Sequence, residues 1–274
     1  MSTTIPMITI IFMVVSALIG LLIPVALYVY NRKKFQANRL PFWVGCVTFV
    51  LFALVLERIM YLFLMKTAIW TAIAGNIWLY GIVGGFFAGL FEETGRFLAF
   101  KTVLRKKRGN DGNGLMYGAG HGGVEAVILL SVTMVMNVVY ALQFNAGNAT
   151  ALGALDAAQT LINTPSWYFL VGAVERIAAV VIHVSLSVLV WFAAKNSKRF
   201  WLFPLAILLH LIVDAVAVIL NGLGVNIWLL EGIVYLLAAA FAVLAVLVWR
   251  KNHTEESAET VMETAEEAQA EAQA

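Results

Sequence analysis

The sequence predicts an all-α membrane protein with about seven transmembrane helices, and three observations support this prediction. The 274-residue chain is 62% hydrophobic and only 12% charged, whereas soluble domains average about 25% charged residues. Seven apolar stretches reach the roughly 17–25 residues that a helix needs to cross a bilayer. Ionisable residues nevertheless occur inside several of these stretches, although a charge in the bilayer core costs roughly 2.5–3.5 kcal/mol.

The predicted spans follow one another with short connections. The longest connection, residues 143–166, is expected to be a plain loop, although Ala149 to Ile162 could instead form a short surface helix that acts as a lid. The first ten residues lack the basic region of a signal peptide, so we expect the first span to be retained. The spans lie near residues 7–30, 41–65, 77–100, 114–142, 167–193, 200–221 and 226–249.

The distribution of Lys and Arg predicts the orientation of the chain. Basic residues concentrate in loops 31–40, 101–113 and 194–199 and directly after the last span, whereas the alternate loops hold only Lys66. By the positive-inside rule, the N-terminus lies outside and the C-terminus lies in the cytoplasm. Anionic lipid facing these loops explains their charge, so nothing indicates a nucleic-acid partner.

The chain is expected to contain one membrane-embedded domain, residues 1–253, followed by an acidic low-complexity cytoplasmic tail, residues 254–274. The tail holds seven glutamates and no apolar face long enough to pack, so we expect it to be solvated and disordered or weakly helical. The single cysteine, Cys46, excludes an internal disulfide and a multi-cysteine metal site.

Glycines gather in the third and fourth spans. Small residues at helical spacing let helix backbones approach closely in lipid. They are interpreted as packing positions, and close approach would also bring the polar residues of these two spans within reach of one another. The glycines are Gly81, Gly84, Gly85 and Gly89, then Gly114, Gly118, Gly120, Gly122 and Gly123.

Ionisable residues in four spans recur at spacings that place them on one helix face. Because these residues fall at similar depths along their spans, they can meet in one cavity. The groups are Glu92, Glu93 and Arg96 in the third span, His121 and Glu125 in the fourth, Arg176 and His183 in the fifth, and His210 and Asp214 in the sixth.

These residue types suit hydrolysis of an amide bond. A buried carboxylate can activate water, and Glu92 and Glu93 are the candidates. Adjacent helical residues point about 100° apart, so one of them is expected to face the cavity. Histidines can donate to the oxyanion or hold a metal, and Arg96 can orient a carboxylate.

Other intramembrane residues have simpler interpretations. A lone histidine such as His183 is more often a packing residue than a catalytic one. Glu231, near the outer end of the last span, is expected to lie at the interface. A second, structural ion-pair layer is expected from two adjacent pairs at matching depth, Glu57–Arg58 and Glu175–Arg176.

Three motifs resemble those of the glutamate-dependent intramembrane proteases, a group that includes the type II CAAX prenyl endopeptidases and the PrsW proteases. The motifs are E-E-x-x-R at 92–96, Y-x-x-x-H at 117–121 and H-x-x-x-D at 210–214. The chain most resembles the YhfC family of bacterial membrane proteins. Two departures from the CAAX pattern agree with this, because only two residues precede Arg96 after the Glu pair and Tyr117 replaces a phenylalanine.

Further segments carry the YhfC resemblance, namely G-A-G-H-G-G-V-E at 118–125, E-R-x-x-x-x-x-x-H at 175–183 and H-L-I-V-D at 210–214. The resemblance implies a helical membrane fold with its site in a cavity open toward the cytoplasm. It makes Glu92 or Glu93 the water-activating base and Arg96 its partner. His121 and His210 become oxyanion donors or metal ligands, with supporting roles for Glu125, Asp214, Glu175, Arg176 and His183.

We therefore expect a bacterial, multi-pass intramembrane endopeptidase that hydrolyses peptide bonds of membrane-embedded or membrane-adjacent substrates. A metal-free mechanism is favoured, because no H-E-x-x-H motif is present. In the other mechanism His121, His210 and a carboxylate hold zinc.

Two other hypotheses, neither of which involves proteolysis, compete with this expectation. Intramembrane Glu, Asp and His also serve proton relays, as in a proton-coupled transporter component. Against a transporter, the sequence contains no recognisable inverted repeat and no paired Pro-broken helices. The other reading is an inactive protease-like immunity or scaffold protein.

Overall fold

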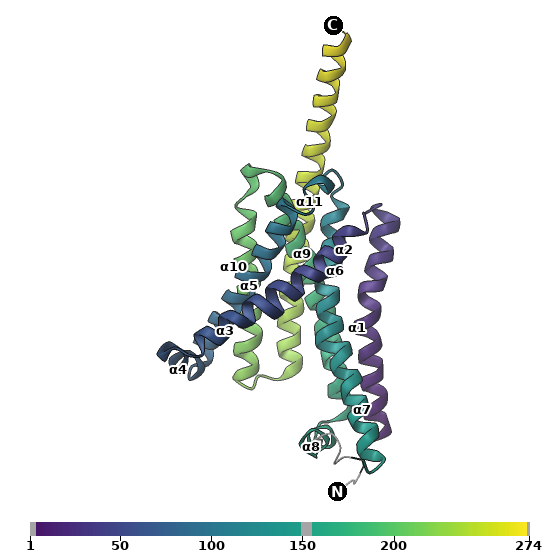
Figure 1. The fold of residues 1–274 in the computed structure, drawn as a ribbon, viewed down its shortest axis with the longest axis vertical. Helices are drawn as coiled ribbons and strands as arrows, with labels where there is room; N and C mark the ends of the chain where they lie inside the picture. The colour runs from purple at the N-terminus through teal and green to yellow at the C-terminus, as the bar shows by residue number, and fades with distance from the viewer. Residues whose placement is uncertain (1–3, 149–154, 273–274) are drawn as a thin grey trace.

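The computed structural model describes residues 4–148 and 155–272, with side chains for residues 4–148 and 158–253, and all regular elements in these residues are helical (Figure 1). Six helices are long and apolar enough to cross a membrane. A seventh span is obtained if Ala68–Ala74 and Ile77–Lys101, which meet at 110°, are taken as one. The predicted all-α multi-span fold is confirmed, whereas the orientation of the termini stays a prediction.

The helices follow the predicted spans, except that the last one continues beyond residue 249 to Ala272, through the segment expected to be a solvated tail. Two spans are continuous helices in which a π-helical segment lies between two α-helical ones. In chain order the elements are α1 (Met7–Lys34), α2 (Leu40–Phe49), η1 (Val50–Glu57), α3 (Arg58–Leu64), α4 (Ala68–Ala74), α5 (Ile77–Lys101), η2 (Arg105–Lys107), α6 (Gly112–Ala126), η3 (Val127–Val132), α7 (Thr133–Asn145), α8 (Leu155–Asn163), η5 (Ser166–Leu170), α9 (Val171–Lys195), η6 (Ser197–Arg199), α10 (Leu202–Gly222) and α11 (Ile227–Ala272).

The sharp bend before α5 has a local cause. The side chain of Asn76 accepts hydrogen bonds from the backbone N–H groups of Trp78 and Leu79, at 2.9 and 3.2 Å. These bonds satisfy two of the four N–H groups that a helix start leaves unpaired. The cap lets α5 begin in a new direction directly after α4.

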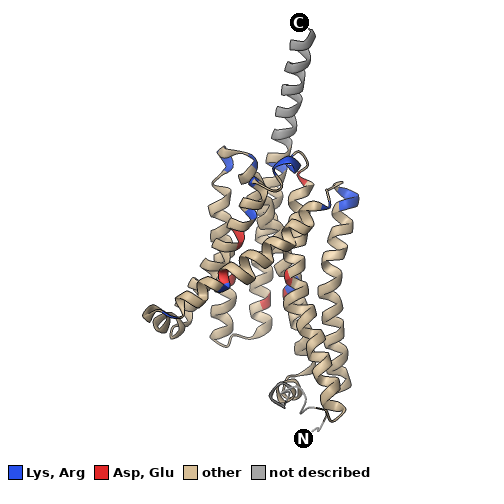
Figure 2. Ribbon diagram, viewed as in Figure 1, with Lys and Arg blue, Asp and Glu red and all other residues tan. Residues whose placement is uncertain are grey.

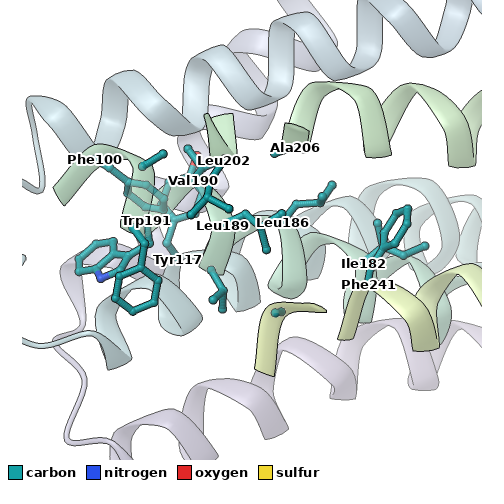
Figure 3. Close-up of a cluster of buried hydrophobic side chains, with 14 of the residues drawn as sticks. Phe100, Tyr117, Ile182, Leu186, Leu189, Val190, Trp191, Leu202, Ala206 and Phe241 are labelled. Atoms are coloured by element: carbon teal, nitrogen blue, oxygen red, sulfur yellow. The ribbon is translucent and has the colours of Figure 1, made fainter. Parts of the chain in front are cut away.

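α9 is the centre of the bundle, since 78% of its most apolar stretch is buried. Its last turns enter a cluster of large apolar side chains that includes Phe100, Tyr117 and Trp191 (Figure 3). Phe100 packs edge-on against both other rings, with ring centroids 4.6 and 5.0 Å apart. This cluster fixes α5, α6 and α9 against one another.

The glycines of the third span pack α5 against α10. A Cβ added at Gly85 would lie 2.5 Å from the backbone oxygen of Leu211, and one at Gly89 would lie 2.7 Å from that of Ile207. Only glycine permits so close an approach of two backbones. The expectation that glycines pack the third span on the fourth is therefore corrected for this stripe.

The glycines of the fourth span serve other neighbours. Gly118 and Gly122 face α9, at Val184 and His183, and Gly120 lies against the backbone of Phe42 in α2. Each predicted glycine cluster is thus a packing surface. The polar groups of α5 and α6 meet because both helices pack against α9.

Lys and Arg gather at one end of the bundle, whereas most of the drawn acidic residues lie near its middle (Figure 2). We call the end formed by loops 31–40, 102–111 and 196–201 the basic end. The link 223–226 between α10 and α11 lies at the opposite end (Figure 1). The connection 143–166, expected to be a plain loop, instead contains the helix given as the alternative, α8, and residues 149–154 lie outside the described part. The acidic tail as a separate unit stays a prediction.

Candidate functional site

Four helices bring ionisable side chains together in the middle of the bundle. α5 contributes Glu92, Glu93 and Arg96, whose exposed fractions are 7%, 0% and 0%. α6 contributes His121, α9 contributes His183 and α10 contributes His210, and all three are buried. Buried charges are tolerated only when they are paired or bind a metal, so their contacts decide what the site can do.

Glu92 and two histidines form the first part of the site. His121 Nε2 lies 2.9 Å from Glu92 Oε2, and His183 Nδ1 lies 3.9 Å from the same oxygen. One ligand atom from each of these three residues lies within 4.8 Å of the others, so the group could hold a metal ion. His121 Nδ1 is buried without a hydrogen-bond partner, which leaves this histidine only partly satisfied by the protein.

Glu125 connects this group to the ion pair of Arg176 and Glu175. Its Oε2 lies 2.5 Å from His183 Nε2, and its other oxygen accepts a hydrogen bond from Arg176. Arg176 also donates to Glu175. A carboxylate on the far nitrogen of a histidine fixes the ring and its tautomer, as in many metal sites. His183 is therefore oriented with Nδ1 toward Glu92.

Glu93 organises the other part of the site. Both of its oxygens accept hydrogen bonds from Arg96 Nη1, at 2.8 and 2.7 Å. The same carboxylate lies 2.8 Å from His210 Nδ1, and His210 Nε2 lies 3.5 Å from Asp214. Glu93 is thus held as an ion-pair partner and orients His210. Arg96 Nη2 lies 3.3 Å from His183 Nδ1 and links the two parts.

A cavity of about 110 Å³ borders the site and is lined by Glu92, Glu125, His183, His210 and Asp214 among others. Glu93 and Arg96 do not line it. Of the two adjacent glutamates, Glu92 is therefore the one whose side chain reaches the cavity. The site cavity is large enough for a few water molecules.

The cavity leads away from the basic end. It shares Glu175, Ala217 and Leu230 with a larger cavity of about 490 Å³. That cavity extends to Asn221 and Ile227 on either side of the link between α10 and α11. Phe100 and Trp191, which pack together in the apolar cluster (Figure 3), lie in the last turns of α5 and α9, next to the basic end.

The expectation of a site open toward the cytoplasm depends on the orientation of the chain and stays a prediction. If the basic end is cytoplasmic, as the loop charges predict, the cavity opens toward the other side. The physical reason is that large buried side chains such as Phe100 and Trp191 pack between the site and the basic end.

Most predicted site residues converge, and two expectations need correction. His183 lies at the centre of the site, and it replaces His210 in the group that could hold a metal. Of the expected ion-pair layer, the Glu175–Arg176 pair is present. Within the described residues, Glu57 and Arg58 make no ion pair and line a cavity beside α5. Glu231 is 4% exposed and lines the 490 Å³ cavity, so its side chain is enclosed by the bundle, and its depth in the bilayer stays a prediction.

Sequence reasoning underestimated His183 because a single histidine in an apolar helix carries little signal. Its spacing from Arg176, two helical turns, was the available clue. Glu125 pairs with Arg176 and lies 2.5 Å from His183, so the spacing reflects a shared partner across helices.

These features define a polytopic membrane protein with a buried cluster of glutamate, arginine and histidine side chains at its centre. The family model described as YhfC intramembrane metalloprotease matches residues 19–234, and the chain belongs to this family. It is 33% identical over 241 residues to the uncharacterized membrane protein YhfC of Bacillus subtilis (strain 168), covering 84% of this chain and 92% of that protein. No solved structure matches the chain. The multi-pass membrane localisation follows from the family and the helices.

Proposed function

We propose that the protein is an intramembrane endopeptidase that cleaves membrane-embedded or membrane-adjacent proteins, and that Glu92, His121 and His183 bind a divalent metal. The observation that carries this proposal is the buried group of three donors within 4.8 Å of one another beside the cavity. The family's description as intramembrane metalloprotease agrees with it.

The donor set suits zinc. Two histidines and one glutamate are the protein ligands of several zinc peptidases, in which water occupies the fourth position. A metal bound there would activate that water and polarise the carbonyl of the substrate. Glu125 fits the role of the carboxylate that orients a histidine ligand. His121 Nδ1, which has no hydrogen-bond partner among the described residues, is also available as a metal ligand.

The remaining residues suit charge stabilisation and proton transfer. Glu93, neutralised by Arg96, holds His210 through Nδ1 and leaves Nε2 beside the cavity. When His210 is protonated on both nitrogens, Nδ1 donates to Glu93 and Nε2 can donate to the carbonyl oxygen as negative charge develops. Asp214 also lines the cavity, and its side chain is 38% exposed, so it can pass a proton to the leaving amine.

A metal-free version has one observation in its favour. His121 Nε2 and Glu92 Oε2 are 2.9 Å apart and form a direct hydrogen bond. In this version His121 orients Glu92, which acts as the base, and His210 stabilises the oxyanion. Substrate and products are the same in both versions, so only metal dependence separates them.

The test combines metal content with cleavage of a peptide library by the full-length protein in lipid nanodiscs. Wild type is compared with Glu92→Gln, His121→Ala and His183→Ala. His253→Ala is the matched control, because this histidine lies outside the site. We expect stoichiometric zinc and cleavage in wild type and in His253→Ala, and loss of both in the three site variants.

The other outcomes are equally informative. Cleavage that persists without bound metal and in the presence of chelators would support the glutamate–histidine version. Absence of cleavage by metal-loaded wild type across the library would overturn the peptidase proposal. Proton-flux measurements in liposomes would then test the transporter alternative.

A further inference from the structure

The 490 Å³ cavity beside the site has the size and chemistry of a substrate-binding site. Cavities of about 300–1,000 Å³ commonly hold small ligands or a few residues of a peptide. It adjoins the site cavity through Glu175, Ala217 and Leu230, and most of its other walls are apolar, such as Phe169 and Val171. A ligand in this cavity would therefore lie next to the proposed reaction centre.

Among the described residues, two carboxyl groups line this apolar cavity, and no Lys, Arg or His does. Glu175 is held by Arg176, which lines the neighbouring site cavity. Glu231 differs, because it is 4% exposed and its Oε2 makes no hydrogen bond to the part of the chain that the structure describes. A buried carboxyl oxygen without a partner is costly, so such a group at a cavity wall points to a ligand that donates to it.

We propose that this cavity binds the peptide substrate and that Glu231 selects a cationic group on it. The ligand chemistry is an ammonium or guanidinium group attached to an apolar peptide segment. Its source is either a Lys or Arg side chain or the free α-amine of a peptide. The inference rests on the proposed peptidase function only for the identity of the ligand as a substrate.

The geometry explains why Glu231 is the selecting residue. Glu231 lies on α11 and Glu175 lies on α9, and both line the same cavity. Because Arg176 already compensates Glu175, the carboxyl group of Glu231 is the one left for an incoming cation. A charge-assisted hydrogen bond of this kind typically changes affinity by roughly 10- to 100-fold.

Equilibrium binding of fluorescent peptides tests this inference separately from catalysis. Binding is measured by fluorescence anisotropy with the full-length chain carrying Glu92→Gln, so that turnover does not interfere. Three apolar octapeptides are compared. The first is acetylated and contains one Lys, the second is acetylated with norleucine in place of Lys, and the third contains norleucine and a free α-amine.

We expect one of the two cationic peptides to bind about 10- to 100-fold more tightly than the neutral peptide, and the tighter one identifies the source of the cation. Glu231→Gln should reduce this preference to below about threefold, whereas Glu231→Asp should restore part of it. Tyr235→Phe is the control. Tyr235 lies one turn after Glu231 on α11, and the variant removes its hydrogen bond to the backbone oxygen of Val174 without changing an acidic residue. It should keep the preference.

Equal affinity for all three peptides, or a preference that survives Glu231→Gln, would overturn the inference. Failure of the peptidase proposal looks different, because it appears as absent cleavage while the binding preference remains. Conversely, cleavage by wild type without any preference for a cation would refute only the role of Glu231.

Discussion

At the scale of single residues, the site separates two adjacent glutamates into different roles. Glu93 accepts two hydrogen bonds from Arg96 and lies 2.8 Å from His210 Nδ1, whereas Glu92 reaches the cavity. The i,i+3 spacing of Glu93 and Arg96 puts them on one helix face. The sequence therefore predicted the pair, but both glutamates were open as its acid.

Glu125 offers a prediction at this scale, because it contacts His183 and not the proposed metal. Glu125→Gln should weaken zinc binding by about 10- to 100-fold, as loss of an orienting carboxylate usually does. The measurement is competition with a chelating dye in nanodiscs.

Glu175→Gln is the matched control for the Glu125 variant. It removes the other acidic partner of Arg176 without touching His183, and its zinc affinity should stay within about threefold of wild type. Equal losses in both variants would show that Arg176 matters and that the orientation of His183 does not.

At the scale of elements, helix packing brings residues from different spans together. Glycines on α5 let it approach α10, and those on α6 let it approach α9. The sequence identified these helix faces from their spacing. It did not identify the partner helix, because any close neighbour would satisfy a stripe of small residues.

Gly85→Ala tests this packing. Its new Cβ would lie 2.5 Å from the backbone oxygen of Leu211, and backbone atoms cannot move aside cheaply. We expect a loss of about 1–3 kcal/mol in the free energy of unfolding, despite the higher helix propensity of alanine. Thermal unfolding in detergent, followed by circular dichroism, measures it.

Gly232→Ala is the corresponding control, since a Cβ at Gly232 meets nothing within 4 Å. This variant should be as stable as wild type or more stable, by up to about 1 kcal/mol. If the two variants unfold at the same temperature, the close α5–α10 contact does not contribute to stability.

At the scale of the whole molecule, one buried aspartate links three helices at the basic end. Asp111, just before α6, accepts hydrogen bonds from Trp191 and Lys195 of α9 and lies 2.7 Å from His253 Nδ1 of α11. Burial tends to raise the pKa of Asp111, but these hydrogen bonds outweigh it and lower the pKa below its ordinary value. Three helices therefore depend on one carboxylate.

A pH dependence follows from this contact. Because the pKa of Asp111 is lower in the folded than in the unfolded protein, its stabilisation is complete above the unfolded pKa, roughly 3.9. It is lost as the pH falls through the lower, folded value. The melting temperature of wild type should therefore approach that of Asp111→Asn at low pH and exceed it at pH 7.

Melting curves from pH 2 to pH 7 measure this difference for both proteins. Asn148→Asp, a change outside this contact, serves as the comparison for general effects of carboxylates. A constant difference between wild type and Asp111→Asn across the whole range would contradict the assignment.

The sequence alone determined that the chain is a multi-span helical membrane protein, because hydrophobic length and basic loops report directly on the bilayer. It also determined most polar residues of the site, since an ionisable side chain in lipid stands out from its surroundings. Only the tertiary structure decided that His183 joins Glu92 and His121, that Glu231 is buried at a cavity, and that the cavity leads away from the basic end. These three features depend on which helix faces meet, and that depends on packing between residues far apart in the chain.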